Sequence, residues 1–205
     1  MVEHSRVIVY IDGFNLYFGL KEMKWRKYYW LDLKQFAQSL LKEGQVLVAV
    51  KYFSARISGP PAKQRRQNTF LEANQKMATC DMFFGHYQEE RRHCPNCNLD
   101  YFVPHEKMTD VNIVVEMLTD AVKNEFDTAI LVSGDSDLAP VLLRVRDLFP
   151  SKRMIVGFPP KRHSKRLRNC AHGTFVIGRD KLAKSQLPDE VPVGSVVLRR
   201  PSSWR

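Results

Sequence analysis

The chain has 205 residues, of which 44% are hydrophobic and 26% are charged. This composition is typical of a folded globular protein and excludes a disordered or fibrous chain, and the length favours one domain with small additions. The apolar runs fall far short of the roughly 20 residues that span a bilayer. The N-terminus also lacks the order of charge, apolar run and small residues of a signal peptide. We therefore expect a cytoplasmic protein without a membrane partner.

The net charge of +10 comes entirely from the C-terminal part of the chain. Residues 1–149 contain 19 basic and 19 acidic side chains, whereas residues 150–205 contain 13 basic and 3 acidic ones. Charge polarised in this way indicates a polyanionic partner, and nucleic acid rather than a membrane because no amphipathic basic helix accompanies it. A basic surface that only keeps the protein soluble is the alternative.

Apolar runs rich in β-branched residues alternate along the chain with stretches of helical periodicity. The run at 6–11 is typical of a strand buried on both faces, as in a parallel sheet. At 110–123 the apolar positions follow the i, i+3, i+4, i+7 spacing of an amphipathic helix. In chain order we predict a strand at 6–11, a helix at 31–42, a strand at 45–53, a helix at 63–77, a strand at 80–87, a helix at 110–123, a strand at 128–132, a helix at 138–148 and a strand at 153–156.

This alternation predicts an α/β fold with a mainly parallel central sheet and helices on both faces. Two stretches do not fit it. Residues 88–105 are polar and interrupt the alternation as an insertion, and residues 185–205 have the prolines and basic side chains of an extended tail. We therefore expect one main domain over residues 1–184, followed by the tail.

Acidic residues stand where two of the predicted strands end. Asp12 follows the first strand, and Asp135 and Asp137 follow the strand at 128–132. Ligands of open α/β sheets bind at this edge, and a further carboxylate, Asp110, begins the long helix. Each aspartate alone is also explained as a helix N-cap, and for Asp110 and Asp135 that interpretation stays open.

Four carboxylates at one sheet edge would repel strongly unless a cation or a proton offset their charge. Hard oxygen ligands are what Mg²⁺ or Mn²⁺ prefers, with several waters retained for a phosphate substrate. The residues therefore predict a metal-dependent phosphoryl-transfer site beside a basic surface.

Three motifs carry a family resemblance: IDGFN at 11–15, EKMTDVNIVVEML at 106–118 and LVSGDSDLAPVL at 131–142. In this order they resemble the NYN domain, a branch of the PIN-like nucleases, over roughly residues 6–178. The resemblance implies a PIN-like three-layer sandwich whose acidic pocket binds one or two divalent ions and cuts RNA. The positions that match the acids of the family are Asp12, Asp110 and Asp135, with Asp137 as a second acid of the last loop and Asn15 beside the first aspartate.

The resemblance implies a divalent-metal-dependent ribonuclease acting on single-stranded or loop RNA. Mg²⁺ or Mn²⁺ would be held by Asp12, Asp110, Asp135 and Asp137, while Asn15 and Ser133 would orient water or phosphate oxygens. A non-catalytic RNA-binding or regulatory NYN protein and a DNA structure-specific nuclease stay open as alternatives. A homodimer is also left open.

Cys94 and Cys97 have the spacing of a zinc knuckle, but a structural Zn²⁺ usually needs four ligands and no second such pair follows. The four cysteines of this long chain do not form a disulfide framework. A redox-labile pair and a plain Pro-Asn turn with two spectator thiols are the alternatives to zinc. Candidates for the missing ligands are Cys80, His86, His93 and His105.

Basic residues after two of the strands are candidates for nucleic-acid binding. The segment 159–168 follows the strand at 153–156, so we expect it along the sheet edge that carries the carboxylates, where it would neutralise backbone phosphates. A solvated basic surface is the alternative. The predicted binding residues are Arg56, Lys161, Arg162, Lys165 and Arg166, with Lys63, Arg65, Arg66 and Arg168 extending the track.

Aromatic and basic residues are interleaved at 24–30. Such a mixture can stack single-stranded bases while it holds phosphates. Core packing is the favoured interpretation for Trp25, Tyr28, Tyr29 and Trp30, because so aromatic a loop usually folds back to bury its rings.

Overall fold

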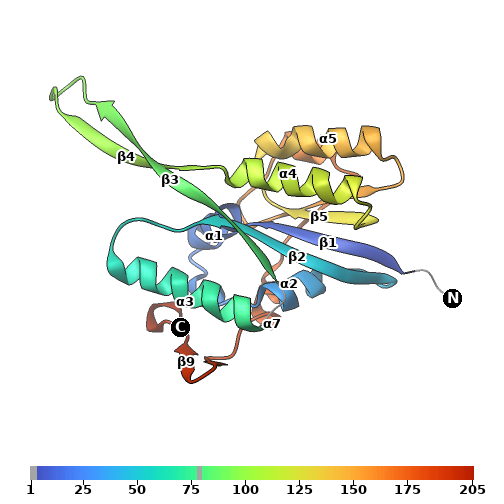
Figure 1. Ribbon diagram of the computed structural model, residues 1–205, viewed down its shortest axis with the longest axis horizontal. Helices are drawn as coiled ribbons and strands as arrows, with labels where there is room; N and C mark the ends of the chain where they lie inside the picture. Colours follow the sequence, from blue (N-terminus) through green and yellow to red (C-terminus); the bar gives the residue numbers. More distant parts are fainter. Residues whose placement is uncertain (1–3, 78–79) are drawn as a thin grey trace.

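A computed structural model describes residues 4–77 and 80–205. Its centre is a seven-stranded sheet in the order β4-β3-β2-β1-β5-β6-β7 (Figure 1). Neighbouring strands pair in parallel except β3 and β4, which are antiparallel. The strands are β1 (Ser5–Asp12), β2 (Gln45–Ala55), β3 (Asp81–His93), β4 (Asp100–Lys107), β5 (Thr128–Val132), β6 (Arg153–Phe158) and β7 (Gly173–Val176).

Helices cover both faces of the sheet, because the central strands turn alternate apolar residues to opposite sides. Val7, Val9 and Ile11 of β1 pack on one face, and Ile8 and Tyr10 pack on the other. The first face carries α1 (Gly13–Glu22), α2 (Leu33–Leu40), α3 (Pro61–Met77) and α7 (Arg179–Lys184), and the second carries α4 (Thr109–Val122), α5 (Ala139–Leu148) and α6 (Lys165–Cys170). The predicted fold class is confirmed. No helix in the described ranges is long and apolar enough to cross a bilayer.

Several elements are present that the hydrophobic pattern did not predict. The ten-residue helix α1 begins directly after β1 and contains Gly13 and Gly19. Glycine and aromatic residues have low helix propensity, so this helix has a weak sequence pattern and starts because Asp12 caps it. The elements α6, β7 and α7 have only six, four and six residues, which is too short for a periodicity to be recognised.

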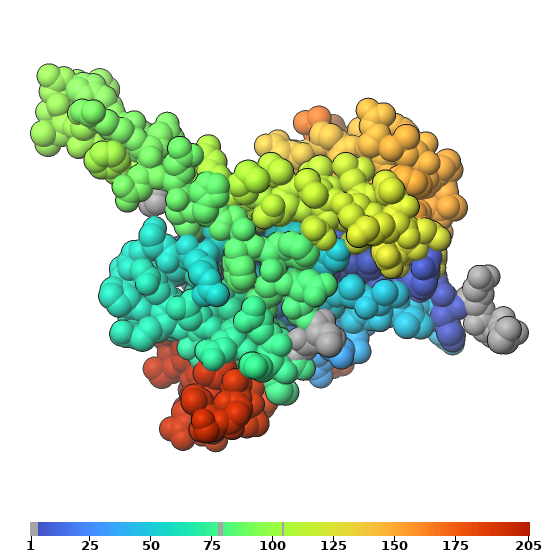
Figure 2. Space-filling model, viewed as in Figure 1, coloured from blue at the N-terminus to red at the C-terminus, as the bar shows by residue number. Residues whose placement is uncertain are grey.

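Residues 88–105, predicted as an insertion, extend β3 and β4 into a two-stranded projection that we call the hairpin arm. His93 lies opposite Asp100, and Gln88 lies opposite His105. The arm leaves the body of the protein and is surrounded by solvent (Figure 1 and Figure 2). Strands with solvent on both faces need no alternation of apolar and polar residues. The hydrophobic pattern of the sequence therefore indicated an insertion here but did not predict the two strands.

Residues 185–205, which we call the C-terminal segment, were predicted as an extended tail but fold against the body. They form β8 (Glu190–Val193), β9 (Val196–Arg199) and a 3-10 turn (Ser202–Trp204). Trp30 Nε1 donates a hydrogen bond to the Pro188 carbonyl at 2.7 Å, and Val191 is fully buried. The prolines that indicated an extended tail are compatible with this hairpin, because proline is tolerated where a strand N–H is not needed for pairing.

An ion-pair network fixes α4 to the sheet. Lys51 of β2 is 8% exposed, and its Nζ lies 2.7 Å from carboxylate oxygens of both Glu116 and Asp120. The Tyr10 hydroxyl donates a further hydrogen bond to Asp120 at 2.6 Å. Because Asp110 lies in the first turn of the same helix, the network also sets the position of that carboxylate at the sheet edge.

Candidate functional site

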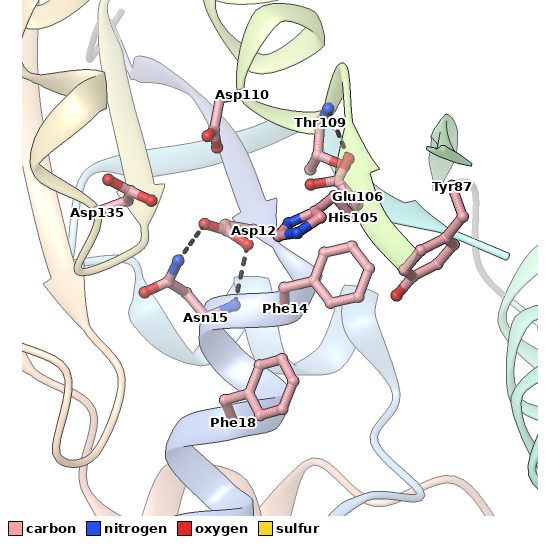
Figure 3. A pocket seen from close by; sticks show the side chains of 10 residues that line it. All are labelled: Asp12, Phe14, Asn15, Phe18, Tyr87, His105, Glu106, Thr109, Asp110 and Asp135. Atoms are coloured by element: carbon pink, nitrogen blue, oxygen red, sulfur yellow. Dashed lines mark hydrogen bonds between the residues drawn. The ribbon is translucent and has the colours of Figure 1, made fainter. Parts of the chain in front are cut away.

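An acidic pocket opens where β1 and β5 end and α4 begins (Figure 3). Its volume is about 330 Å³. Three of the four predicted acids, Asp12, Asp110 and Asp135, line it, whereas Asp137 lies in the 3-10 turn that follows β5 and outside the lining. The other lining residues are Phe14, Asn15, Phe18, Tyr87, His105, Glu106 and Thr109.

Asp12 is the last residue of β1 and is 2% exposed. Its Oδ1 caps α1 by accepting the backbone N–H of Asn15 at 3.0 Å. Its Oδ2 accepts hydrogen bonds from Asn15 Nδ2 at 2.6 Å and from the Ser133 hydroxyl at 2.8 Å. Burial raises the pKa of Asp12, and the hydrogen bonds from Asn15 and Ser133 oppose this rise. The carboxylate is therefore held in one orientation beside the pocket.

The loop after β5 is tied to Asp12 through the two residues that were predicted to orient ligands. The Ser133 hydroxyl oxygen accepts the N–H of Asp135 at 3.0 Å, and Asn15 Oδ1 accepts the N–H of Gly134 at 3.2 Å. Asp135 caps the following 3-10 turn by accepting the N–H of Asp137 at 2.9 Å. Asn15 and Ser133 thus position the carboxylates, and their direct contact with water or phosphate stays a prediction.

Asp110 lies in the first turn of α4 and is not its cap. Its pKa is raised from 3.8 to about 7, first by burial and then by the negative charges of Asp12, Asp135, Glu106 and Asp137. All four predicted acids therefore interact electrostatically. Without a metal the site holds a proton near neutral pH, and a divalent cation would relieve the same repulsion.

Two residues from the base of the hairpin arm reach the pocket and were not predicted to belong to the acidic site. Glu106 accepts the backbone N–H of Thr109 at 3.0 Å and also its hydroxyl, and so caps the start of α4. His105, which the sequence offered only as a zinc candidate, lines the pocket (Figure 3). Glu106 could have been found from the sequence because it belongs to the motif at 106–118. Nothing in the sequence indicated that β4 brings His105 to the acidic pocket.

Aromatic rings form one side of the pocket. The rings of Phe14 and Phe18 are stacked with centroids 6.4 Å apart, and Tyr87 meets Phe14 edge-on, also at 6.4 Å. An aromatic wall next to carboxylates can receive the flat face of a base while the phosphate lies at the acids.

The donor chemistry of the pocket fits Mg²⁺ or Mn²⁺, although no closed ligand cage is built. Within residues 4–77 and 80–205, no three His, Cys, Asp or Glu side chains are gathered closely enough to form a complete metal site. The carboxylates of Asp12, Asp110 and Asp135 offer hard oxygen ligands, and the cavity of about 330 Å³ leaves room for water. The set therefore suits an ion that keeps several waters.

Cys94 and Cys97 lie at the tip of the hairpin arm, far from the pocket. Hydrogen bonds from Cys97 and from the backbone N–H of Asn96 lower the pKa of the Cys94 thiol. Both ring nitrogens of His93 are engaged, at 3.1 Å from Asp100 and at 3.0 Å from Asn98.

The other predicted zinc ligands are remote from this tip. Cys80 precedes β3, whose 13 residues place it about 40 Å from Cys94 at the rise of an extended strand. Cys80 is thereby excluded as a partner, and His86 and His105 lie at the base of the arm. Zinc binding by Cys94 and Cys97 stays a prediction that needs ligands from elsewhere.

Among the five predicted nucleic-acid-binding residues, Arg162 packs against the loop that follows β5. A Cβ placed on Gly134 would lie 2.8 Å from Arg162 Cβ, and the Arg162 guanidinium pairs with Glu22 at 3.2 Å. Arg56 lies over the ring of Phe84, 5.0 Å from its centroid. The other three, Lys161, Lys165 and Arg166, are exposed. Binding of nucleic acid by these residues stays a prediction.

The aromatic stretch after α1 is mainly part of the core, as expected. Trp30 is fully buried and Tyr28 is 5% exposed, so neither ring is free to stack a base. Tyr29 and Trp25 are half-buried and pack against the same core.

Comparisons with known proteins agree with the geometry of the fold. The profile of the NYN domain family matches residues 6–178. A relative from Pseudomonas putida named 6-hydroxy-3-succinoylpyridine 3-monooxygenase HspA is 27% identical over an alignment of 244 positions, and the alignment covers 98% of this chain and 76% of the relative. A solved structure of a protein of unknown function from Vibrio parahaemolyticus has a TM-score of 0.60 at 22% identity, covering 90% of this chain and 98% of that chain. The last likeness shows a shared fold.

Proposed function

The chain belongs to the NYN domain family, and from this membership we propose that it is a divalent-metal-dependent nuclease that hydrolyses phosphodiester bonds of single-stranded RNA. The family implies a nuclease-like fold of the PIN superfamily. The observation that carries the proposal is the convergence of Asp12, Asp110 and Asp135 in one pocket at the carboxyl edge of the sheet.

In this proposal Asp12, Asp110 and Asp135 hold Mg²⁺ or Mn²⁺, with Asp137 acting through water. When bound, the ion lowers the pKa of a water molecule and offsets the charge that builds on the scissile phosphate. The fixed orientation of Asp12, which is bonded to both Asn15 and Ser133, keeps the ligand set from rearranging when the substrate enters.

The protein's own groups perform the remaining tasks. Asp110 has a pKa of about 7 in the metal-free site, so binding of a cation displaces a proton near neutral pH. The aromatic wall of Phe14, Phe18 and Tyr87 supports a base next to the cleaved bond, and Arg162 stands beside the loop of Asp135, where it can pair with a neighbouring phosphate.

A second candidate comes from the relative that is named a monooxygenase. The aromatic wall would suit a small aromatic ring, which is the feature that favours this candidate. Oxygenation of a ring needs a redox cofactor, and the common flavin and nicotinamide cofactors carry phosphates. Carboxylates that already repel one another, as the raised pKa of Asp110 indicates, would also repel those phosphates. We therefore place the nuclease first.

The test is cleavage of a mixed pool of end-labelled single-stranded RNA and DNA in EDTA, in Mg²⁺ and in Mn²⁺. Asp135→Asn is the informative variant, and Asp147→Asn is its matched control because Asp147 is exposed on α5. We expect cleavage of RNA by the parent and the control only with metal, and a loss of about 100-fold or more in the Asp135→Asn protein.

Other outcomes select among the alternatives. Preferential cleavage of DNA would replace RNA as the substrate and keep the mechanism. Equal cleavage by Asp135→Asn and the parent would indicate a contaminating nuclease. RNA binding by both without products at any metal concentration would favour the non-catalytic RNA-binding protein.

A further inference from the structure

We propose that a single-stranded nucleic acid leaving the acidic pocket follows a track of aromatic rings to an arginine-lined pocket on the C-terminal segment, where a backbone phosphate binds. This inference rests on the proposed nuclease function, because it extends the path of the same substrate. It adds a second phosphate-binding site that lies outside the acidic pocket.

The second cavity, which we call the arginine pocket, lies between α3 and the C-terminal segment and has a volume of about 350 Å³. Its lining contains three arginines and three hydroxyl groups and no carboxylate. Positive charges that line one cavity repel one another unless anions offset them, and arginine and hydroxyl donors together match a phosphate. The residues that supply these groups are Arg65, Arg66, Arg199, Thr69, Ser202 and Ser203.

The arginines of α3 are free to bind such an anion. Across the part of the chain that the structure describes, neither Arg65 nor Arg66 forms an ion pair with a carboxylate. Arg199 pairs with Glu190 at 3.2 Å, but both side chains are largely exposed, so this pair contributes little and is easily exchanged for a phosphate.

A chain of ring contacts, which we call the aromatic track, connects the two cavities. It starts at Phe14 and Phe18 of the acidic pocket, which extend along α1 away from Asp110 (Figure 3). Phe18 contacts Tyr17 with centroids 5.4 Å apart, and Tyr17 contacts Tyr29 at 5.1 Å.

The aromatic track ends next to the arginine pocket. Tyr29 meets the ring of Trp204 at 5.7 Å, and Trp204 directly follows Ser203, which lines that pocket. Tyr17 and Phe18 are 41% and 42% exposed, so part of each side chain is accessible to a base. Lys21 Nζ lies 5.5 Å from the centroid of Phe18 and adds a positive charge along the way.

The hairpin arm also leaves the acidic pocket, but its charge does not favour nucleic acid. Residues 88–105 contain three acidic and two basic side chains in a chain whose net charge is +10. Arg91 pairs with Asp100 and Arg92 with Glu90, so each basic side chain of the arm has a carboxylate beside it. The arginine pocket has no carboxylate in its lining and includes Arg65 and Arg66, which form no ion pair in the described residues, and this positive charge favours the route over α1.

The route also depends on residues outside the family match. The NYN profile ends at residue 178, whereas Arg199, the serines and Trp204 belong to the C-terminal segment. The aromatic track and arginine pocket would thus give this chain a dependence on substrate length that the family core alone does not explain.

The test measures fluorescence anisotropy of labelled single-stranded oligonucleotides of 4 and 12 nucleotides, a range that spans about the usual site size of such proteins. It uses the full chain with Asp135→Asn, in EDTA, so that cleavage does not interfere. Arg65→Gln/Arg66→Gln removes the two free arginines, and Arg91→Gln/Arg92→Gln on the hairpin arm is the matched control. A Tyr17→Ser variant tests stacking separately.

We expect the Arg65→Gln/Arg66→Gln pair to weaken binding of the 12-mer about tenfold and to reduce the slope of log K against log salt by about 1. Tyr17→Ser should weaken the 12-mer by about tenfold without changing that slope. Binding of the 4-mer should change neither with Arg65→Gln/Arg66→Gln nor with the control pair Arg91→Gln/Arg92→Gln. Thermal unfolding of each variant checks that the fold is intact.

Equal 12-mer binding by the two arginine pairs, or no preference for the longer strand, would overturn the inference. The cleavage assay keeps the two proposals apart. The cleavage assay uses protein in which Asp135 is restored. If Arg65→Gln/Arg66→Gln does not affect cleavage by this protein, the nuclease proposal holds and the aromatic track is wrong. Length-dependent binding without any cleavage would leave the track and remove the nuclease.

Discussion

Replacing Asp110 with asparagine should stabilise the metal-free protein while it removes a ligand of the proposed metal site. The carboxyl of Asp110 has its pKa raised from 3.8 to about 7 by burial and by the neighbouring carboxylates, Asp12 first. A raised carboxyl pKa means that the folded state binds the proton more tightly than the unfolded chain does. Above neutral pH the folded protein therefore holds a destabilising charge that an amide does not have.

The size of the effect follows from the pKa change. A tenfold change in proton affinity corresponds to about 1.4 kcal/mol, so a rise from 3.8 to about 7 amounts to at most about 4 kcal/mol. Asp110 is only half-buried, and solvent screening reduces this value to roughly 2 kcal/mol. For a protein of this size, that predicts a rise in Tm of about 4–8 °C at pH 8.

The stability difference between Asp110→Asn and the parent should depend on pH. For the parent, the contribution of the neutral carboxyl is fully present below about pH 4 and is lost as the pH rises through 7. The advantage of Asp110→Asn should therefore be largest at pH 8, shrink toward pH 5 and vanish below pH 4. Thermal unfolding in EDTA at these three pH values measures it, with Asp147→Asn as the exposed control.

Added metal should make the parent more stable than Asp110→Asn. Mg²⁺ or Mn²⁺ that binds only the folded parent raises its Tm with concentration, whereas Asp110→Asn should respond much less. An Asp110→Asn protein that is no more stable than the parent at pH 8 in EDTA, or whose advantage is the same at pH 5 and pH 8, would refute the electrostatic reasoning.

Three further predictions concern other parts of the molecule. Lys51→Met leaves Glu116 and Asp120 without their cation and should cost about 3–5 kcal/mol of unfolding free energy by urea titration; a loss no larger than that of the exposed control Lys76→Met would contradict it. In Gly85→Ala the new Cβ would overlap Lys107 O and Glu106 Oε1, so nuclease activity should fall at least about tenfold. Gly178→Ala, which meets nothing within 4 Å, is the control, and equal activity of the two would count against the packing argument. Zinc held by Cys94 and Cys97 should be shared between two chains, because the tip of the arm adds to these two thiols only His93, whose ring nitrogens are both hydrogen-bonded. Metal analysis that finds one zinc per monomer would show this to be wrong.

The sheet and the acidic residues could be predicted because both follow from simple regularities. Strands buried on two faces appear as continuous apolar runs, as at Val7–Ile11, and parallel strands bring their carboxyl ends to one edge. Asp12, at the end of β1, and Asp135, in the loop after β5, are therefore expected to be near each other once these two strands are adjacent. Asp110 joins them because the helix that carries it begins at the same edge.

The hairpin arm and the C-terminal segment could not be predicted because their contacts lack a local signal. Both faces of the arm are exposed, and its apolar residues, such as Tyr101 and Phe102, are adjacent and do not alternate with polar ones, so no periodicity marks its strands. The return of Glu106 and His105 to the pocket depends on the register between β3 and β4. The C-terminal segment is held by single long-range contacts, such as the bond from Trp30 to Pro188 and the packing of Trp204, and no sequence pattern announces these.

The two interpretations of the aspartates, helix cap and site residue, turn out to be compatible. Asp12 caps α1 and Asp135 caps a 3-10 turn, yet a carboxylate has about four lone-pair directions, and a cap uses one of them. Capping helps to fix the rotamer, and Asp12, which also accepts hydrogen bonds from Asn15 Nδ2 and the Ser133 hydroxyl, still has a lone-pair direction left for a ligand. Asp110 does not cap a helix, so its charge is not stabilised by a hydrogen bond from a free backbone N–H of a helix N-terminus. Its pKa is raised to about 7. The protonation of Asp110 should therefore respond to the arrival of a cation.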